Sequence, residues 1–210
     1  MPGLRERKKQ QTREAIAQTA RALFVERGFE AVRVAEVAAA AEVSEKTVFN
    51  YFPTKEDLFF GGMVAFEAEL VDAVRTRPAG ESVPAAFRRF VLERSARLAA
   101  EEVADVVATT ARIVTASSAL RAREREIVSR YTDELAALVA EETGRSAEDV
   151  EPWAVANALM GVQRALVRFV RASVLGGTRG TALAAGVREQ ADAAFGLLDR
   201  GLADYGVRPE

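Results

Sequence analysis

Residues 43–60, VSEKTVFNYFPTKEDLFF, bring hydroxyl, amide, ammonium and aromatic groups into one short segment. On a helix from Glu45 to Phe52, Val48 and Phe52 lie four positions apart on one face, which we expect to be buried. The outward face then carries Glu45, Lys46, Thr47, Asn50 and Tyr51, with Phe49 at its border. Thr and Tyr can contact phosphate, Asn can pair with an adenine edge, and Lys can reach phosphate or guanine. This face therefore suits a DNA groove.

Much other chemistry is excluded because the 210-residue chain has no Cys and no His. Thiol nucleophiles, disulfides, Cys/His zinc sites and His-based acid–base catalysis are all ruled out. The sequence offers no nucleophile–base pair and no metal-ligand cluster. We therefore expect a protein that is not an enzyme and that requires no cofactor and no metal.

The charge is unevenly distributed, although the net charge is only −2. Residues 1–13 carry five basic side chains and one acidic side chain, Glu6. The basic residues are Arg5, Arg7, Lys8, Lys9 and Arg13. A basic arm of this kind suits phosphate contact, and a solubilising disordered tail is the alternative.

The distribution of apolar residues predicts a protein that does not enter a membrane. Apolar residues make up 49% of the chain, which is ample for a buried core. No uncharged run is long enough to span a bilayer, and the N-terminus is polar and basic rather than an apolar leader. We expect a cytoplasmic protein.

Helical periodicity begins near the N-terminus and predicts an all-α fold. From Thr12, a candidate N-cap, apolar residues recur at helical spacing up to Gly28, which should end the first helix. The second helix is expected over 34–40. The third is capped by Ser44 and ends before Pro53.

A fourth helix should run from Lys55 to about Arg75, because Thr54 can cap it with Asp57 three residues further on. Later breaks predict helices over 84–100, 103–115, 118–142, 152–175 and 181–204, giving about nine in all. We divide the chain into a basic arm (1–9), a three-helix head with a helix-turn-helix (10–55) and a helical body (56–210).

Residues 10–70 resemble the DNA-binding domain of the TetR family of transcriptional regulators, which extends to about residue 70 along the fourth helix. The closest stretch is GFEAVRVAEVAAAAEVSEKTVFNYFPTKEDLF, residues 28–59. Matching positions are Gly28, Phe29, Ala38, Ala41, Val43, Ser44, Thr47, Phe52, Lys55 and Leu58. The remaining chain is similar to the family only in its helical layout.

The sequence departs from the family pattern at three positions. Arg33 replaces a Thr that caps the second helix, which exchanges a cap for a phosphate contact. Glu42 replaces the Gly of the turn, so it is strained if the backbone there has a positive φ. Phe49 replaces a Tyr, so the hydroxyl that the resemblance places on a phosphate is missing. The resemblance and the exposed face together predict a DNA-binding set of Arg5, Arg7, Lys8, Lys9, Arg13, Arg33, Ser44, Lys46, Thr47, Phe49, Asn50, Tyr51 and Lys55.

The body should hold a small organic ligand and a dimer interface. Aromatic and mixed-polarity positions give the candidate pocket residues Phe59, Met63, Phe66, Phe87, Phe90, Arg112, Trp153, Asn157 and Met160, although such residues are also typical of plain core. The resemblance implies that the last two helices pair with their copies as a four-helix bundle. Small and apolar positions then form the dimer interface: Ala154, Ala158, Gly161, Ala165, Leu183, Val187, Ala194 and Leu198.

Gly61 and Gly62 lie inside the fourth helix, where each costs about 0.8–1.0 kcal/mol relative to Ala. Close packing against a neighbouring helix is one explanation. The other is a hinge, because the resemblance makes this helix the connection between the DNA head and the ligand body.

These observations predict a homodimeric, ligand-responsive, sequence-specific DNA-binding regulator. We expect a repressor released from a pseudo-palindromic double-stranded operator by a small apolar or amphipathic organic effector. A transcriptional activator of the same family is one alternative, and a helical interaction scaffold that never binds DNA is another. The sequence identifies neither the effector, the operator nor the regulated genes.

Overall fold

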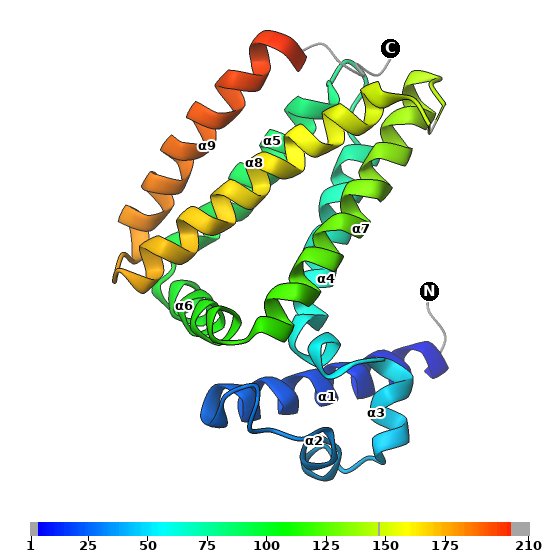
Figure 1. Ribbon diagram of the computed structural model, residues 1–210, viewed down its shortest axis with the longest axis vertical. Coiled ribbons are helices and arrows are strands. Elements are labelled where there is room, and N and C mark those ends of the chain that lie inside the picture. The colour runs from blue at the N-terminus through cyan, green and yellow to red at the C-terminus, as the bar shows by residue number, and fades with distance from the viewer. Residues whose placement is uncertain (1–3, 147, 203–210) are drawn as a thin grey trace. The chain divides into compact units, whose positions relative to one another are not determined.

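The computed structural model describes the backbone of residues 4–146 and 148–202, and their side chains except those of 4–6, 62–67, 200 and 202. The described backbone is all-helical, without strands, as the sequence predicts (Figure 1). Its elements are α1 (Leu4–Arg27), α2 (Val34–Ala40), α3 (Glu45–Tyr51), α4 (Lys55–Arg75), α5 (Val83–Ala96), a 3₁₀ turn η1 (Arg97–Ala99), α6 (Glu101–Ala116), α7 (Ser118–Thr143), α8 (Val150–Leu175) and α9 (Gly180–Leu202).

The chain forms two compact units. The head comprises Met1–Ala65 together with Arg112–Glu124, and the body comprises Phe66–Ala111 together with Arg125–Glu210. Three helices, α4, α6 and α7, are continuous across the division. The segment Arg112–Glu124, at the α6–α7 junction, belongs to the head although it lies far along the chain.

The first helix is longer than the sequence predicts. It begins at Leu4, so Thr12 is an interior residue and not an N-cap. Its hydroxyl donates to the Lys8 carbonyl at 3.0 Å, a bond that a helical Thr can make one turn back. The basic residues from Arg7 onwards therefore lie on a regular helix, and the alternative of a disordered tail is excluded for them.

The predicted caps of α3 and α4 are confirmed. Ser44 Oγ accepts the backbone N–H of Thr47 at 3.1 Å. At the start of α4, the Thr54 hydroxyl accepts the Asp57 N–H at 3.2 Å and the Asp57 carboxylate accepts the Thr54 N–H at 3.1 Å. This reciprocal pair satisfies two donors that the helix itself leaves unpaired.

The turn between α2 and α3 is set by hydrogen bonds at the end of α2. The Val43 N–H donates to the Ala38 carbonyl at 2.9 Å, and the Glu42 N–H donates to the Ala39 carbonyl at 3.2 Å. This is a Schellman motif, whose penultimate position normally carries Gly because its backbone is left-handed. Glu42 occupies that position with φ of 54°, so the condition under which the sequence predicts strain at Glu42 is met.

Gly61 is buried in the head, and a Cβ there would come within 3.2 Å of Phe52 Cε1. Such a contact is tight for a real Cβ, and Phe52 is itself only 1% exposed. Close packing against Phe52 therefore explains the glycine at position 61. The surroundings of Gly62 are outside what the structure describes, and the hinge hypothesis remains a prediction.

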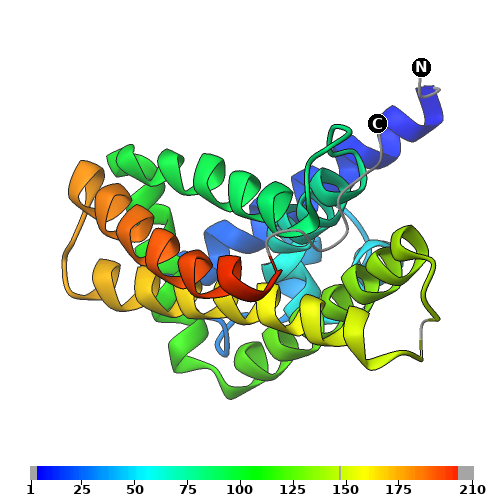
Figure 2. The ribbon, with the colours of Figure 1, turned by 90° about the horizontal axis from the view of Figure 1, so that it is seen from above.

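The body is built around α5, α8 and α9, which pack against one another (Figures 1 and 2). Helices α8 and α9 lie side by side and are joined by a short turn through Gly176 and Gly177. A second apolar cluster joins α6 to them and contains Ala104, Ala108, Ala111, Val174, Leu183 and Val187.

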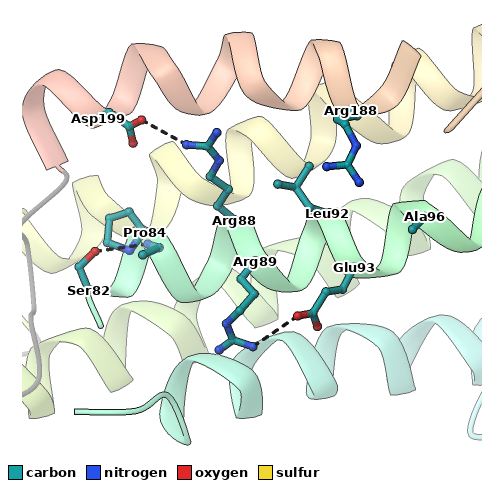
Figure 3. A pocket seen from close by; sticks show the side chains of 10 residues that line it. Ser82, Pro84, Arg88, Arg89, Leu92, Glu93, Ala96, Arg188 and Asp199 are labelled. Atoms are coloured by element: carbon teal, nitrogen blue, oxygen red, sulfur yellow. Dashed lines mark hydrogen bonds and ion pairs between the residues drawn. The ribbon is translucent and has the colours of Figure 1, made fainter. Parts of the chain in front are cut away.

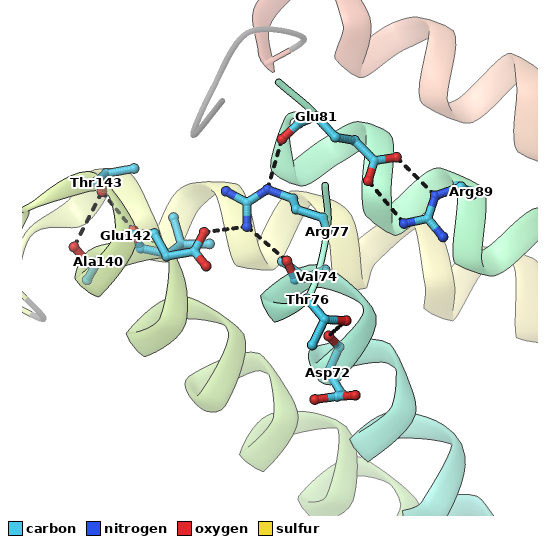
Figure 4. A network of polar contacts seen from close by, with 10 residues as sticks. Asp72, Val74, Thr76, Arg77, Glu81, Arg89, Ala140, Glu142 and Thr143 are labelled. Atoms are coloured by element: carbon cyan, nitrogen blue, oxygen red, sulfur yellow. Dashed lines mark hydrogen bonds and ion pairs between the residues drawn. The ribbon is translucent and has the colours of Figure 1, made fainter. Parts of the chain in front are cut away.

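Arg77 is the largest fully buried side chain of the described residues, at 2% exposure (Figure 4). It follows α4 and donates to the Val74 carbonyl at 2.8 Å and the Glu81 carbonyl at 2.9 Å. Its guanidinium also forms an ion pair with Glu142 near the end of α7. One side chain thus ties together the ends of α4 and α7 and the loop that leads to α5.

None of the described helices is by itself long and apolar enough to cross a membrane. The bent pair Glu101–Ala116 and Ser118–Thr143, at 108°, reaches that length and hydropathy only when the two are taken together.

Candidate functional site

Helix α3 presents two different faces. Val48 is fully buried and Phe52 is 1% exposed, as the helical spacing predicts. The outward face exposes Glu45, Lys46 and Asn50 and partly exposes Thr47 and Tyr51. Within the part of the chain that the structure describes, the side chains of Lys46 and Asn50 form no hydrogen bond or ion pair. Both are available to base edges or phosphates.

The hydroxyls at the start of α3 are already engaged. Ser44 Oγ and Thr47 Oγ1 lie 2.8 Å apart and share a hydrogen bond, in addition to the cap. A hydroxyl can still accept or donate a further bond. A phosphate at this end of α3 would therefore meet an ordered pair of hydroxyls.

Phe49 is 45% exposed, so it is neither a core residue nor fully solvated. It is one of the few large apolar side chains with such exposure in the described part of the chain. A single exposed apolar side chain of this kind is common on protein surfaces and does not by itself indicate a partner.

Arg33 and its neighbours form a charged cluster at the start of α2. The Arg33 N–H donates to Glu36 Oε2 at 2.8 Å, and Arg27 Nη2 lies 2.8 Å from Glu36 Oε1. The backbone N–H of Arg33, followed by the Arg27 guanidinium, holds the pKa of Glu36 below its ordinary value of 4.5. Glu36 therefore performs part of the capping for which Arg33 is unsuited. The Arg33 side chain is 83% exposed, with its Nε 3.5 Å from Glu36 Oε2, and a phosphate contact there remains a prediction.

Lys55 has a structural role that the sequence did not reveal. Its ammonium lies 4.3 Å from the centre of the Phe29 ring and donates to the Glu30 carbonyl at 3.5 Å. A cation over an aromatic face is stabilising by about 0.5–1 kcal/mol at a partly exposed site. This contact accounts for a Lys in the first turn of a helix, and a phosphate contact at Lys55 remains a prediction.

The basic side chains of α1 do not all behave alike. Arg7, Lys8 and Lys9 are exposed, whereas Arg13 lies over the Phe52 ring at 4.9 Å from its centre. Arg13 is thereby fixed beside the end of α3. The side chain of Arg5 lies outside the described residues.

Sequence reasoning missed two long-range contacts of the head. Arg123 of α7 donates to Asp57 Oδ1 from Nε at 3.0 Å and from Nη2 at 2.7 Å. Ser117 Oγ donates to Glu30 Oε1 at 2.6 Å. The partners lie 66 and 87 residues apart in the chain, so local pattern could not have paired them.

The predicted ligand residues are dispersed. Phe59 packs in the aromatic cluster of the head, with ring centres 6.1 Å from Phe24 and 6.2 Å from Phe29. Phe87 and Met160 are buried, and Phe90 is 8% exposed. Arg112 is exposed. The side chains of Met63 and Phe66 lie outside the described residues.

Trp153 and Asn157 lie on the surface of the single chain. Trp153 is 43% exposed, and the Asn157 amide donates to the Trp153 carbonyl at 2.8 Å. We therefore do not place them in the wall of a cavity within one subunit.

A groove of about 630 Å³ lies along α5 and α9 in the body (Figure 3). None of the predicted ligand residues whose side chains are described lines it. Its apolar wall comes from Pro84 and Leu92, and Figure 3 shows Arg88 pointing across it towards Asp199. Most of its charges are already paired: Arg88 with Asp192 at 2.8 Å and Asp199 at 3.3 Å, and Arg89 with Glu81 at 3.0 Å. The groove is a salt-bridged surface rather than a preformed anion site.

The predicted dimer residues fall into two groups. Ala154 and Ala165 are exposed, and Ala158, Gly161, Ala194 and Leu198 are partly exposed, so all six can meet a partner. Leu183 and Val187 are 1% and 2% exposed because they belong to the core cluster of this chain. They have no surface to offer, and we assign them to the core as a correction. Leu197 on α9, which the sequence analysis did not name, is an apolar side chain that is 67% exposed.

The described residues contain no group of three or more His, Cys, Asp or Glu side chains that could hold a metal ion.

Two helices joined by a tight turn, with a polar outward face on the second, and a separate helical body together define a helix-turn-helix regulator. Family comparison agrees with this class. Residues 16–61 match the model of the bacterial regulatory proteins of the tetR family, and residues 81–194 match the model of the MftR C-terminal domain. The chain belongs to the tetR family of transcriptional regulators.

A curated relative is the HTH-type transcriptional regulator TcmR of Streptomyces glaucescens, 37% identical over 81 residues. That match covers 39% of this chain and 36% of TcmR, so it spans about a third of the length of the relative.

Solved structures share the fold. FadR of Bacillus subtilis in complex with stearoyl-CoA has a TM-score of 0.53 at 20% identity, covering 87% of this chain and 97% of that one. FadR of Thermus thermophilus in complex with lauroyl-CoA has a TM-score of 0.53 at 22% identity, covering 87% and 92%. NalD of Pseudomonas aeruginosa has a TM-score of 0.51 at 20% identity, covering 94% and 98%.

Proposed function

We propose that the protein is a homodimeric repressor that binds a pseudo-palindromic DNA operator and leaves it when a small organic effector binds the body. In this proposal it is not an enzyme, and it acts in the cytoplasm, where operator DNA is found. The observation that supports it best is α3, whose buried Val48 and Phe52 anchor an outward face on which Lys46 and Asn50 are exposed.

On DNA, α3 of each subunit would enter the major groove, at half-sites separated by one helical turn or a multiple of it. Asn50 would read an adenine edge, while Lys46 and Tyr51 contact phosphate or guanine. The exposed Arg7, Lys8 and Lys9 of α1 would follow the phosphates. Arg33, 83% exposed, would add a contact from the start of α2.

The dimer would form through the open face of α8 and α9. Ala154 and Ala165 permit close helix approach, and Leu197 supplies an exposed apolar side chain. Leu197→Asp should convert the dimer to monomer in sedimentation velocity, because the carboxylate would be desolvated in the interface. If the variant dimerises with unchanged affinity, the dimer interface does not include Leu197.

The effector would be an amphipathic organic molecule. The acyl-CoA complexes of the two FadR structures support this class, because such ligands are accommodated by bodies of the same fold. Lauroyl-CoA and stearoyl-CoA are therefore the first probes, together with mass spectrometry of small molecules that co-purify with the protein.

The test is selection of an operator from random double-stranded DNA, followed by binding at several salt concentrations. We expect a palindromic consensus and affinity that falls steeply with salt, because each phosphate contact releases about one counterion. Lys46→Ala should weaken binding and lower the salt slope. Asn50→Ala should relax preference at one base position, by about 1–3 kcal/mol. If no consensus emerges, the scaffold alternative is favoured.

A further inference from the structure

Arg188 of α9 lines the groove between α5 and α9 and differs from the other cations there (Figure 3). It is exposed, and among the described residues its side chain has no hydrogen bond or ion pair. Asp192 lies one helical turn further along α9, at the spacing that favours a salt bridge, but it binds Arg88 at 2.8 Å instead. The groove therefore contains a guanidinium whose hydrogen-bond donors are available to a ligand.

The two carboxylates that line the groove are engaged by other arginines. Asp199 lies 3.3 Å from Arg88, and Glu93 lies 4.0 Å from Arg89. A carboxylate that binds Arg188 therefore leaves these salt bridges in place.

The wall of the groove on α5 is apolar along one stripe. Ala85, Leu92 and Ala96 recur at spacings of seven and four residues, which places them on one side of the helix. Pro84 extends the stripe at the start of α5, and the methylene stem of Arg88 adds apolar surface within it. At 1.5 Å per residue, the stripe from Ala85 to Ala96 is about 16 Å long. With a volume of about 630 Å³, the groove suits a small, elongated organic molecule.

We propose that this groove binds an organic carboxylate with an apolar chain. The carboxylate receives two hydrogen bonds from the Arg188 guanidinium, because the planar fork of an arginine matches the two oxygens. Figure 3 shows Arg188 on α9 opposite Leu92 on α5. The chain therefore leaves the guanidinium along Leu92 and continues over the Arg88 stem towards Pro84. Both helices contribute to the site.

This site goes beyond the proposed function and is separate from the effector site named there. None of the candidate effector residues with a described side chain lines the groove. Its ligand contacts α5 and α9, whereas operator binding depends on α3, so the test needs no DNA. Failure of this proposal leaves the proposed function intact, and failure to select an operator leaves this proposal intact.

Isothermal titration calorimetry of the full chain with decanoate tests the proposal. Decanol has the same chain without the charge, decyltrimethylammonium has the opposite charge, and acetate has the carboxylate without the chain. We expect saturable binding of one decanoate per subunit, and binding at least about tenfold weaker for each of the other three. Octanoate should bind about fifteenfold more weakly than decanoate, since each buried methylene contributes a factor of about four.

Arg188→Gln identifies the group that binds the anion. Because Arg188 is exposed, the fold should be unchanged, which circular dichroism melting checks. We expect decanoate binding to weaken by at least about tenfold while decanol binding is unaffected. Arg168→Gln, at an exposed arginine of α8 outside the groove, is the matched control and should bind as wild type. Leu92→Asn should weaken decanoate and decanol alike, because it removes part of the apolar wall.

A fluorescent label locates the ligand independently of affinity. The chain has no Cys, so Ala96→Cys carries one label per subunit at the end of the groove, on an exposed position. Ala40→Cys carries the same label on an exposed position of the head. Decanoate should shift the emission of the label at position 96 and leave that at position 40 unchanged.

The proposal is overturned if decanoate does not bind saturably, or if Arg188→Gln binds it as tightly as wild type. It is also overturned if decanol binds as well as decanoate, or if both labels respond equally. Decanoate that enters the effector site instead of the groove binds Arg188→Gln unchanged and gives no response at position 96.

Discussion

The residue type of Phe49 does not decide whether its side chain packs against the protein or contacts DNA. Its ring is 45% exposed, so a hydroxyl added at the ring edge reaches solvent without disturbing the core. We expect Phe49→Tyr to leave the melting temperature unchanged and to tighten operator binding by about tenfold or more, because a hydrogen bond to a charged group contributes about 1.5–3 kcal/mol. Fluorescence anisotropy with the selected operator measures this.

Phe49→Ala is the matched variant for the same position. It should also leave stability nearly unchanged, because a half-exposed ring contributes little to the core. A large loss of stability in either variant would show that the ring is needed for packing rather than for DNA.

Glu42 combines two unfavourable features in one residue. Its φ of 54° is left-handed, which costs a non-Gly residue about 1 kcal/mol, and its charge lies two positions before the Ser44 cap of α3. Glu42→Gly should raise the melting temperature by about 2–4 °C and also tighten operator binding, because a negative charge near phosphates is removed.

Glu42→Ala separates the two effects. Alanine removes the charge but keeps the strained backbone, so we expect tighter DNA binding with no gain in stability. If Ala stabilises as much as Gly, the cost at this position does not come from the backbone.

At the scale of elements, the start of α2 depends on Glu36 rather than on the residue before the helix. The folded head lowers the pKa of Glu36, through the Arg33 N–H first and the Arg27 guanidinium second. The unfolded chain therefore binds a proton more readily. The contribution of Glu36 to stability is complete above its ordinary pKa of 4.5 and is lost as pH falls through the lowered folded value.

Glu36→Gln should accordingly be less stable than wild type at pH 7, with a difference that narrows towards pH 3. Urea denaturation at several pH values measures it. Glu26→Gln, an exposed neighbour on α1, is the control and should show no such trend. A constant difference across this range would mean that the charge of Glu36 is not involved.

The helices were largely predictable because their caps are local. Ser44, Thr54 and Asp57 mark their helix starts by residue type and spacing alone, and α2 and α4 have the predicted bounds. The start of α1 was wrong because Thr12 resembles a cap but donates back to Lys8 within a longer helix. Nothing in the local pattern distinguishes the two uses of a Thr.

The sequence predicted the site correctly only where helical periodicity determines which side chains are buried. Val48 and Phe52 were correctly assigned to the buried face of α3, because residues four positions apart lie on the same side of a helix. Leu183 and Val187 were misassigned because α9 has apolar residues on more than one side, and spacing cannot say which side meets α6. The contacts of Arg123 and Ser117 depend on tertiary structure and have no local signature.

At the scale of the whole molecule, the ends of α4 and α7 in the body are joined by the buried pair Arg77–Glu142 (Figure 4). The Arg77 side chain is 1% exposed and that of Glu142 is 17% exposed. Removing one partner of such a pair leaves the other charge without compensation, which typically costs 3–5 kcal/mol. Because Glu142 retains some contact with water, we expect Arg77→Met to cost about 3 kcal/mol, at the low end of that range.

The pair Arg89–Glu81 provides the matched comparison, because it has the same chemistry with Arg89 42% exposed. Arg89→Met should cost less than about 1 kcal/mol. The double variant Arg77→Met with Glu142→Leu should recover only part of the loss, because the Val74 and Glu81 carbonyls still lack their donor. Chemical denaturation of the full chain measures all three. Equal costs for Arg77→Met and Arg89→Met would show that burial adds nothing to this ion pair, and that other contacts hold α4 and α7 together in the body.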